Sequence, residues 1–285
     1  MTDQPQWPQR RTFLKAALAS AVGTALPVSV TKAAPFHQTH LQVWSCGGLA
    51  EAFLPANALY GERTGVTVSY TGAFAAALGK SLLGSAETEV FAGRVLDLAK
   101  KLRQAEKMLY FKPLCFTSYV MVTPKGNPAG IASIGDMAKP GVRVVLAPDA
   151  SPPGGQAALN LLKKAGILDP VMKNAVTLGS CVQRTMDDVI SGKGDVSIVE
   201  LRITRMPDFT GKMEVLAIPE EFFPPPPLTF TIGVMRHARD RALADDYVKF
   251  MTSSEGQKFF EQQGFIPAIS EKGQALVEKL GVKDV

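Results

Sequence analysis

The sequence predicts an α/β protein with two lobes, each built on a mostly parallel sheet flanked by helices. Short apolar and β-branched runs recur along the chain, beginning with Leu41–Ser45 and Val66–Tyr70, and such runs are typical of strands. Turns of small residues, such as Cys46–Gly48, follow these runs and lead into segments of helical composition. Repetition of strand, turn and helix favours parallel strands joined by helical crossovers.

The remaining elements follow in the same manner. Further strands are expected at 89–92, 142–146, 176–178, 195–199 and 213–218. Helices are expected at about 49–63, after 71–73, from 93 to about 107, at 156–165, from 181 to about 192, at 243–251 and at 254–263. Two longer extended segments, 115–123 and 228–235, are natural crossovers between lobes. We therefore expect lobe one to contain 35–116 plus 231–285, and lobe two to contain 117–230.

The first 34 residues have the order of features found in an export signal. Two adjacent arginines, Arg10 and Arg11, precede Phe-Leu-Lys and are typical of a twin-arginine leader. The mildly apolar stretch Ala16–Val30 is shorter than the roughly 20 residues that span a bilayer, and Thr31–Ala34 offers small residues for cleavage. We expect a periplasmic protein exported by the twin-arginine route. The alternative is a basic tail that precedes an ordinary helix.

Much of the positive charge belongs to this leader. The whole chain has a net charge of +5. Residues 1–34 contain four basic residues and one acidic residue, a net of +3, which leaves about +2 for the mature chain. So small a charge gives no case for nucleic-acid binding. No Ser/His/Asp or Cys/His arrangement indicates an enzyme, and no cofactor is expected.

The turns after four expected strands are the candidate binding site. In α/β lobes, ligands bind outside the carboxyl ends of strands, and the free N–H groups of a following helix attract anions. Glycines in these turns permit close approach of the backbone to a ligand. The candidate ligand-binding residues in the turns are Ser45, Cys46, Gly47, Gly48, Thr71, Gly72, Ala73, Gly154, Gly155, Cys181 and Val182.

Several stretches resemble one family. These are VWSCGGLAEAF (43–53), TEVFAGRVLDLAKKL (88–102), the long run 121–167, VISGKGDVSIVE (189–200) and GQKFFEQQGF (256–265). Together they are similar to the periplasmic molybdate-binding proteins of ABC importers, a type II solute-binding family. The resemblance implies a two-lobed type II periplasmic binding protein fold with the ligand cleft between the lobes. It also implies a monomer that delivers an oxyanion of the molybdate or tungstate type to an ABC permease in the inner membrane.

The pocket departs from the family pattern. The family usually places Ser where this chain has Gly48 and near Ala73, and Tyr where it has Glu200. Arg94 falls in a loop that lines the family's cleft, and its planar guanidinium could clamp an anion, although a solvated helix residue is the alternative. Glu200 would repel an oxyanion unless it is protonated or paired. A surface ion pair with Arg202 is its other interpretation.

Three cysteines give an alternative ligand chemistry. An odd number in an exported protein leaves at least one thiol without an intramolecular partner. The resemblance implies that Cys46, Cys115 and Cys181 all lie near the cleft. With Glu200 they could bind a soft metal or metalloid ion as thiolates, for uptake or for sensing with a membrane histidine kinase. Burial in the core and a Cys46–Cys181 disulfide stay open as other possibilities.

Overall fold

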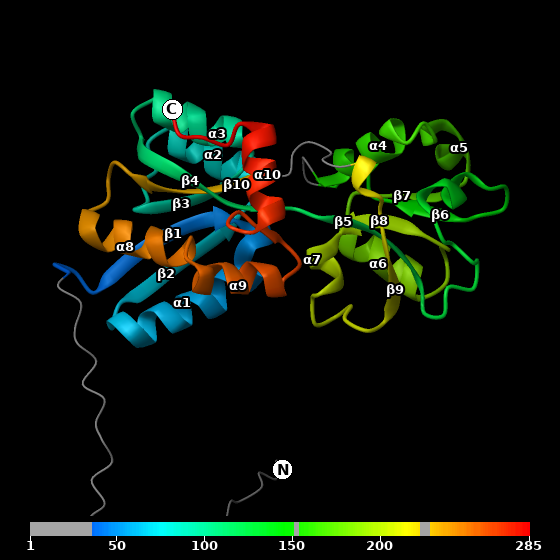
Figure 1. Ribbon diagram of the computed structural model, residues 1–285, viewed down its shortest axis with the longest axis horizontal. Helices are drawn as coiled ribbons and strands as arrows, with labels where there is room; N and C mark the ends of the chain where they lie inside the picture. The colour runs from blue at the N-terminus through cyan, green and yellow to red at the C-terminus, as the bar shows by residue number, and fades with distance from the viewer. Residues whose placement is uncertain (1–35, 151–153, 223–228) are drawn as a thin grey trace, which may run out of the picture. The chain divides into compact units, whose positions relative to one another are not determined.

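A computed structural model describes residues 36–150, 154–222 and 229–285 of the chain. The expected leader lies outside these ranges, as does part of the expected turn at 151–155. Two separate sheets with flanking helices organise the described residues (Figure 1). Among these residues, no helix is both long enough and apolar enough to cross a membrane.

The first sheet contains six strands in the order β11-β4-β10-β3-β1-β2. Strand β1 is parallel to both β2 and β3, whereas β10 is antiparallel to both β3 and β4. The bounds of the strands are β1 His40–Cys46, β2 Thr67–Ala73, β3 Val90–Arg94, β4 Met108–Phe116, β10 Thr229–Met235 and β11 Ile266–Pro267.

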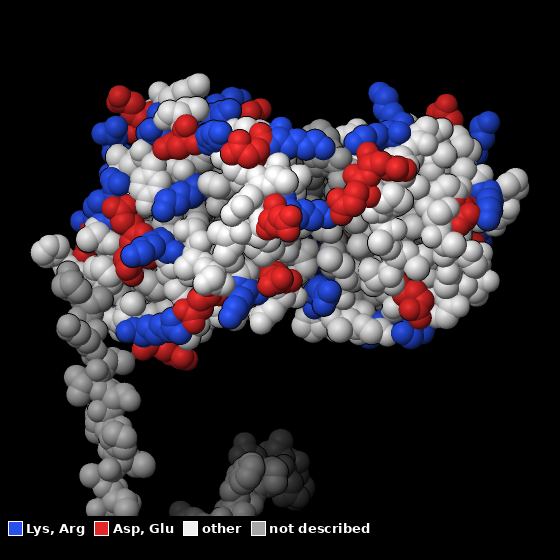
Figure 2. All heavy atoms as spheres, in the orientation of Figure 1, with Lys and Arg blue, Asp and Glu red and all other residues white. Residues whose placement is uncertain are grey.

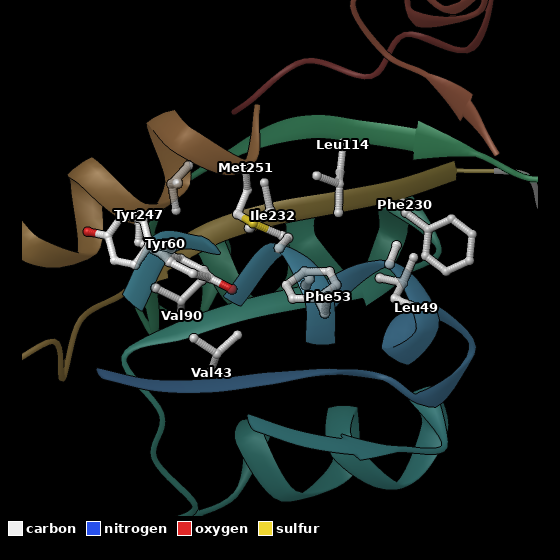
Figure 3. Close-up of a cluster of buried hydrophobic side chains, with 14 of the residues drawn as sticks. Val43, Leu49, Phe53, Tyr60, Val90, Leu114, Phe230, Ile232, Tyr247 and Met251 are labelled. Carbon is white, nitrogen blue, oxygen red and sulfur yellow. The ribbon is translucent and has the colours of Figure 1, made fainter. Parts of the chain in front are cut away.

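Helices cover both faces of the first sheet because neighbouring residues of each strand point to opposite faces. Val90 packs in a large core with side chains of α1, α8 and α9, whereas Phe91 packs with α2 and α3. Figure 3 shows Phe53 and Tyr60 of α1 beside strand residues of this larger core. The helices are α1 Ala50–Thr64, α2 Ala75–Leu83, α3 Leu96–Gln104, α8 Arg241–Met251, α9 Ser254–Gln262 and α10 Glu271–Leu280.

The second sheet has three antiparallel strands in the order β8-β5-β9. A parallel pair, β6 and β7, adjoins it through a bridge between Val144 and Val196. The strands are β5 Tyr119–Pro124, β6 Val144–Leu146, β7 Ala175–Leu178, β8 Ser197–Glu200 and β9 Met213–Ala217. The helices of this part are α4 Gly154–Lys164, α5 Leu168–Lys173, α6 Val182–Ile190 and α7 Leu201–Thr204. Short 3₁₀ turns occur at η1 Gly47–Leu49, η2 Ile134–Ala138 and η3 Glu220–Phe222.

The predicted α/β class is confirmed, but strand directions are more mixed than expected. Strands β4 and β10 carry the chain between the two groups of elements in opposite senses, so they pair antiparallel in the first sheet. The expected segment 115–123 is two strands, because β4 ends at Phe116 and pairs in the first sheet while β5 begins at Tyr119 and pairs in the second. The sequence analysis also missed α5, α7 and α10.

The larger core gives a test of the fold. Phe53 is fully buried against Tyr70 and Phe260, while the next residue, Leu54, is 55% exposed. Replacing Phe53 by Ala should lower the free energy of unfolding by about 3–5 kcal/mol. Replacing Leu54 by Ala on the same helix should change it by less than about 0.5 kcal/mol. Urea denaturation of both variants measures the difference, and equal effects would contradict this packing.

Candidate functional site

A cavity of about 710 Å³ lies at the carboxyl ends of strands from both sheets. Residues at the ends of β1, β2 and β3 line one part of it, and residues at the end of β8 and the starts of α4 and α6 line another. Ten residues predicted from the sequence are in this lining, namely Cys46, Gly47, Gly48, Gly72, Ala73, Arg94, Gly155, Cys181, Val182 and Glu200. Their role in ligand binding stays a prediction.

Three charged side chains meet inside the cavity. Arg94 ends β3, Glu200 ends β8, and Arg202 lies in the first turn of α7. The Nη2 atom of Arg94 donates to Oε1 of Glu200 at 2.5 Å, and Nε of Arg202 donates to Oε2 at 2.5 Å. The Glu200 side chain is only 7% exposed. One carboxylate therefore joins a guanidinium group from β3 of the first sheet to a guanidinium group from α7, the helix that follows β8 of the second sheet.

Strand register brings a tyrosine to the same place. Tyr119 begins β5 and pairs directly with Glu200 across the second sheet. Its hydroxyl accepts a hydrogen bond from Nη2 of Arg94 at 3.3 Å and lies 3.5 Å from Oε1 of Glu200. Burial and the Glu200 charge raise the pKa of Tyr119. The tyrosine is therefore a neutral hydroxyl at physiological pH.

The electrostatics of the cluster keep Glu200 ionised. Burial alone would raise its pKa, but the nearby charges of Arg94 and Arg202 and their hydrogen bonds lower the pKa to about 2. Burial would lower the pKa of Arg94, and the Glu200 charge reverses this and raises it. Glu200 and Arg94 are therefore both charged at neutral pH. The surface ion pair considered for Glu200 is instead a buried one.

Arg94 keeps a donor that none of the described residues uses. Its Nε atom is buried without a hydrogen-bond partner among the described residues. A buried donor left unpaired costs roughly 1–3 kcal/mol, and a bound anion would remove that cost. The guanidinium also lies over the ring of Phe230, with 5.4 Å between its central carbon and the ring centroid. These contacts hold Arg94 in place while its Nε–H stays without a partner among the described residues.

Two helices that begin at the cavity, α2 and α6, lack side-chain caps. Phe74 precedes α2 and Cys181 precedes α6, and neither side chain accepts a hydrogen bond from its helix. By contrast, the side chains of Asp240, Ser253 and Ser270 cap α8, α9 and α10. Uncapped N–H groups at a helix N-terminus attract anions. The cavity therefore combines an arginine donor with backbone donors.

The described lining does not include Ser45, Thr71 or Cys115. The Ser45 hydroxyl is buried, with its oxygen 2.5 Å from the hydroxyl of Tyr70 and 3.0 Å from the carbonyl oxygen of Cys46. Thr71 is in register with Trp44, which packs on the α2–α3 side of the sheet. Gly154 starts α4 beside Gly155, which is in the lining. Cys115 packs in the larger core.

The cysteines are free in the structure and differ in exposure. Cys46 is 9% exposed and Cys181 is exposed, and both line the cavity, whereas Cys115 is fully buried. The disulfide between Cys46 and Cys181 is therefore not formed. Within the described ranges, no group of three or more His, Cys, Asp or Glu side chains is arranged to hold a metal ion. The set of four metal ligands with Glu200 is thus not assembled, since Glu200 is already bound by arginines.

Sequence reasoning missed several residues of the lining, and Tyr119 and Phe74 are two of them. Tyr119 carries no local signal, because only the pairing of β5 with β8 brings it beside Glu200. Phe74 precedes α2 in the predicted turn and is 69% exposed. An exposed aromatic residue at a turn could have been noticed as a candidate contact, because aromatic side chains are usually at least partly buried.

With this geometry in hand, the comparisons with known proteins identify the family. The family of bacterial extracellular solute-binding proteins matches residues 41–266. The chain belongs to this family. It is 25% identical over 259 residues to the molybdate-binding protein ModA of Mycobacterium tuberculosis, covering 86% of this chain and 91% of the relative. The resemblance found in the sequence is confirmed. The relatives named here are binding proteins, as expected for a chain that is not an enzyme.

Solved structures show the same fold. The substrate-binding domain assigned to a molybdenum ABC transporter of Clostridium difficile matches with a TM-score of 0.72 and 20% identity, covering 81% of this chain and 99% of that one. The periplasmic molybdate-binding protein of Azotobacter vinelandii matches with a TM-score of 0.63 and 18% identity, covering 79% and 98%. The type II periplasmic binding protein fold predicted from the sequence is confirmed.

The exposure of the thiols predicts an order of reaction. Burial raises the pKa of Cys115 well above its usual value, and this residue has no contact with solvent. With iodoacetamide, we expect Cys181 to be alkylated first, Cys46 more slowly, and Cys115 only after unfolding. Peptide mass spectrometry at successive times gives the order. Alkylation of Cys115 in the folded protein at the rate of Cys181 would contradict the structure.

The low pKa of Glu200 predicts the pH range in which its carboxylate takes up a proton. Because the folded-state pKa is below the ordinary 4.5, this carboxylate stabilises the fold above its unfolded pKa, and that stability is lost as the pH falls through about 2. The ¹³C chemical shift of its carboxyl carbon should stay constant from about pH 7 to about pH 4. The variant Glu200→Gln assigns the resonance. A midpoint at or above the ordinary value would show that the carboxylate is not held between the arginines.

Proposed function

We propose that this protein is exported to the periplasm by the twin-arginine route, binds a small inorganic oxyanion, and delivers it as a monomer to an ABC permease. Molybdate and tungstate are the first anions to test. The single observation that carries the proposal is the buried, unpartnered Nε atom of Arg94 in a cavity that also receives uncapped helix N-termini. These are donors for an anion, and the described lining contains no matching metal site.

The proposed binding step uses groups from both sheets. Arg94 would donate through its planar guanidinium, while backbone N–H groups near Gly47, Ala75 and Val182 would donate from loops and helix starts. We further propose that 35–116 plus 231–285 and 117–230 are lobes that close about a hinge. Closure of this kind is stabilised when the ligand contacts both lobes.

The relatives support this ligand class. The Mycobacterium tuberculosis relative is named for molybdate, as is the Azotobacter vinelandii protein. The Clostridium difficile domain is named as part of a molybdenum ABC transporter. The network of Arg94, Glu200 and Arg202 in this chain differs from the Ser and Tyr pattern expected of the family, so the chemical identity of the oxyanion is decided by experiment.

A second candidate rests on two thiols. Cys46 and Cys181 both line the cavity, and thiolates select soft ions such as Cu(I). Under this proposal the protein would bind a soft metal or metalloid ion, for uptake or for sensing with a membrane histidine kinase. A binding site of two thiolates would need further ligands from the backbone or from the bound species itself.

Calorimetric titration of molybdate and tungstate tests the first proposal. We expect wild-type protein to bind both anions. The variant Arg94→Gln should bind them about tenfold to a hundredfold more weakly, because a hydrogen bond to a charged group contributes roughly 1.5–3 kcal/mol. The matched control is Arg184→Gln, since Arg184 is exposed on α6 and lies outside the described lining.

Circular dichroism must first show that Arg94→Gln is folded, because it leaves Glu200 with one arginine. Absence of heat and of thermal shift for wild-type protein with either anion would refute oxyanion binding of this type. Equal affinities for wild-type protein and a folded Arg94→Gln would refute the role of Arg94.

The same titration separates the two candidates. The double variant Cys46→Ala/Cys181→Ala should retain oxyanion affinity, because the thiols are not needed for the arginine and backbone donors. If it loses affinity, and wild-type protein binds Cu(I) where the double variant does not, the thiolate candidate is favoured.

A further inference from the structure

We propose that Glu200 determines the charge of the ligand, so that the cavity prefers a singly charged oxyanion to a doubly charged one of the same shape. This inference rests on the proposed function, in which the cavity binds an oxyanion. It assigns Glu200 a role in specificity that goes beyond holding two arginines in place.

The first step is the charge of the cavity. Among the described residues of its lining, those with charged side chains are Arg94, Arg202 and Glu200. The internal segments outside the described ranges, 151–153 and 223–228, contain no charged residue in the sequence. The side chains therefore supply a net charge of about +1 where two arginines alone would supply +2. On the face drawn in Figure 2, surface charges of both signs are interspersed, and solvent screens them.

The second step is the position of the carboxylate. Both oxygens of Glu200 are bound, one to Arg94 and one to Arg202, at 2.5 Å each. The guanidinium of Arg202 lies directly against Gly48, since a Cβ atom at that glycine would be 3.2 Å from it. The negative charge is therefore fixed close to the loop whose N–H groups would bind the anion. A ligand that reaches Arg94 comes near Glu200, which is 7% exposed and poorly screened by water.

The third step concerns how ion energies depend on charge. The cost of removing an ion from water grows with the square of its charge, whereas its attraction to the cavity grows only in proportion to its charge. Lowering the cavity charge by one unit therefore costs a doubly charged ligand twice as much attraction as a singly charged one. The doubly charged ion also has the larger desolvation cost, and its reduced attraction to the cavity offsets less of that cost. Glu200 thus favours the singly charged ion.

Perrhenate and tungstate are suitable probes because both are tetrahedral oxyanions of nearly equal size that differ by one charge. Calorimetry on the mature protein should give an affinity for perrhenate that is at least about tenfold higher than the affinity for tungstate. The variant Glu200→Gln should shift the ratio of the two affinities toward tungstate by about tenfold or more. The control Glu261→Gln removes the same charge from an exposed position outside the described lining and should leave the ratio unchanged.

A second variant, Arg202→Gln, tests the same inference if Glu200→Gln does not fold. Arg202 is 19% exposed, and Arg202→Gln lowers the cavity charge further. It should weaken tungstate binding by about the square of the factor by which it weakens perrhenate binding. A tungstate preference in wild-type protein, or a ratio that Glu200→Gln and Arg202→Gln leave unchanged, would overturn the inference alone. Failure of wild-type protein to bind either anion would overturn the proposed function as well.

Discussion

The buried carboxylate of Glu200 between Arg94 and Arg202 is the interaction on which the site depends. Burying one charge without partners would cost several kcal/mol, so each member needs the others in place. Arg94 comes from the first sheet, while Glu200 and Arg202 come from the second sheet and the helix after it. The cluster therefore forms only when both sheets are folded and adjacent. The cavity that contains this ion cluster therefore depends on the folding of both sheets.

Local backbone geometry holds the arginine that completes this cluster. Val95 follows Arg94 with φ at 79°, which is a rare and costly conformation for a β-branched residue. Its N–H donates to the carbonyl oxygen of Thr229 at the start of β10, which fixes the end of β3 against its neighbour. Strain of this kind persists only where surrounding contacts over-determine the backbone. Here these contacts are the pairing of β3 with β10 and the packing of Arg94 over Phe230.

The sequence predicted the features that local patterns encode. Strand, turn and helix units placed eight residues in the cavity lining, because a turn after a parallel strand lies at the carboxyl edge of its sheet. The family resemblance added Arg94 and Glu200. The sequence could not predict that Tyr119 lies beside Glu200, since that contact depends on antiparallel register between β5 and β8. For Cys115 the sequence left a ligand role and burial both open, and the side chain packs in the larger core. Register and pleat are set by long-range packing.

Two residues that depart from the expected family pattern, Gly48 and Glu200, both contact Arg202 in the structure. The family resemblance implies Ser where this chain has Gly48, and Tyr where it has Glu200. The guanidinium of Arg202 occupies the space beside Gly48, and a side chain at that position would press on it at 3.2 Å. Glu200 in turn binds this guanidinium. The small residue therefore leaves space for the arginine that the carboxylate binds, and a Cβ atom at position 48 would require the guanidinium to shift by a few tenths of an ångström. Loss of Glu200 would instead leave the buried guanidinium of Arg94 without its carboxylate. The space at Gly48 and the charge of Glu200 thus act on the same ion cluster.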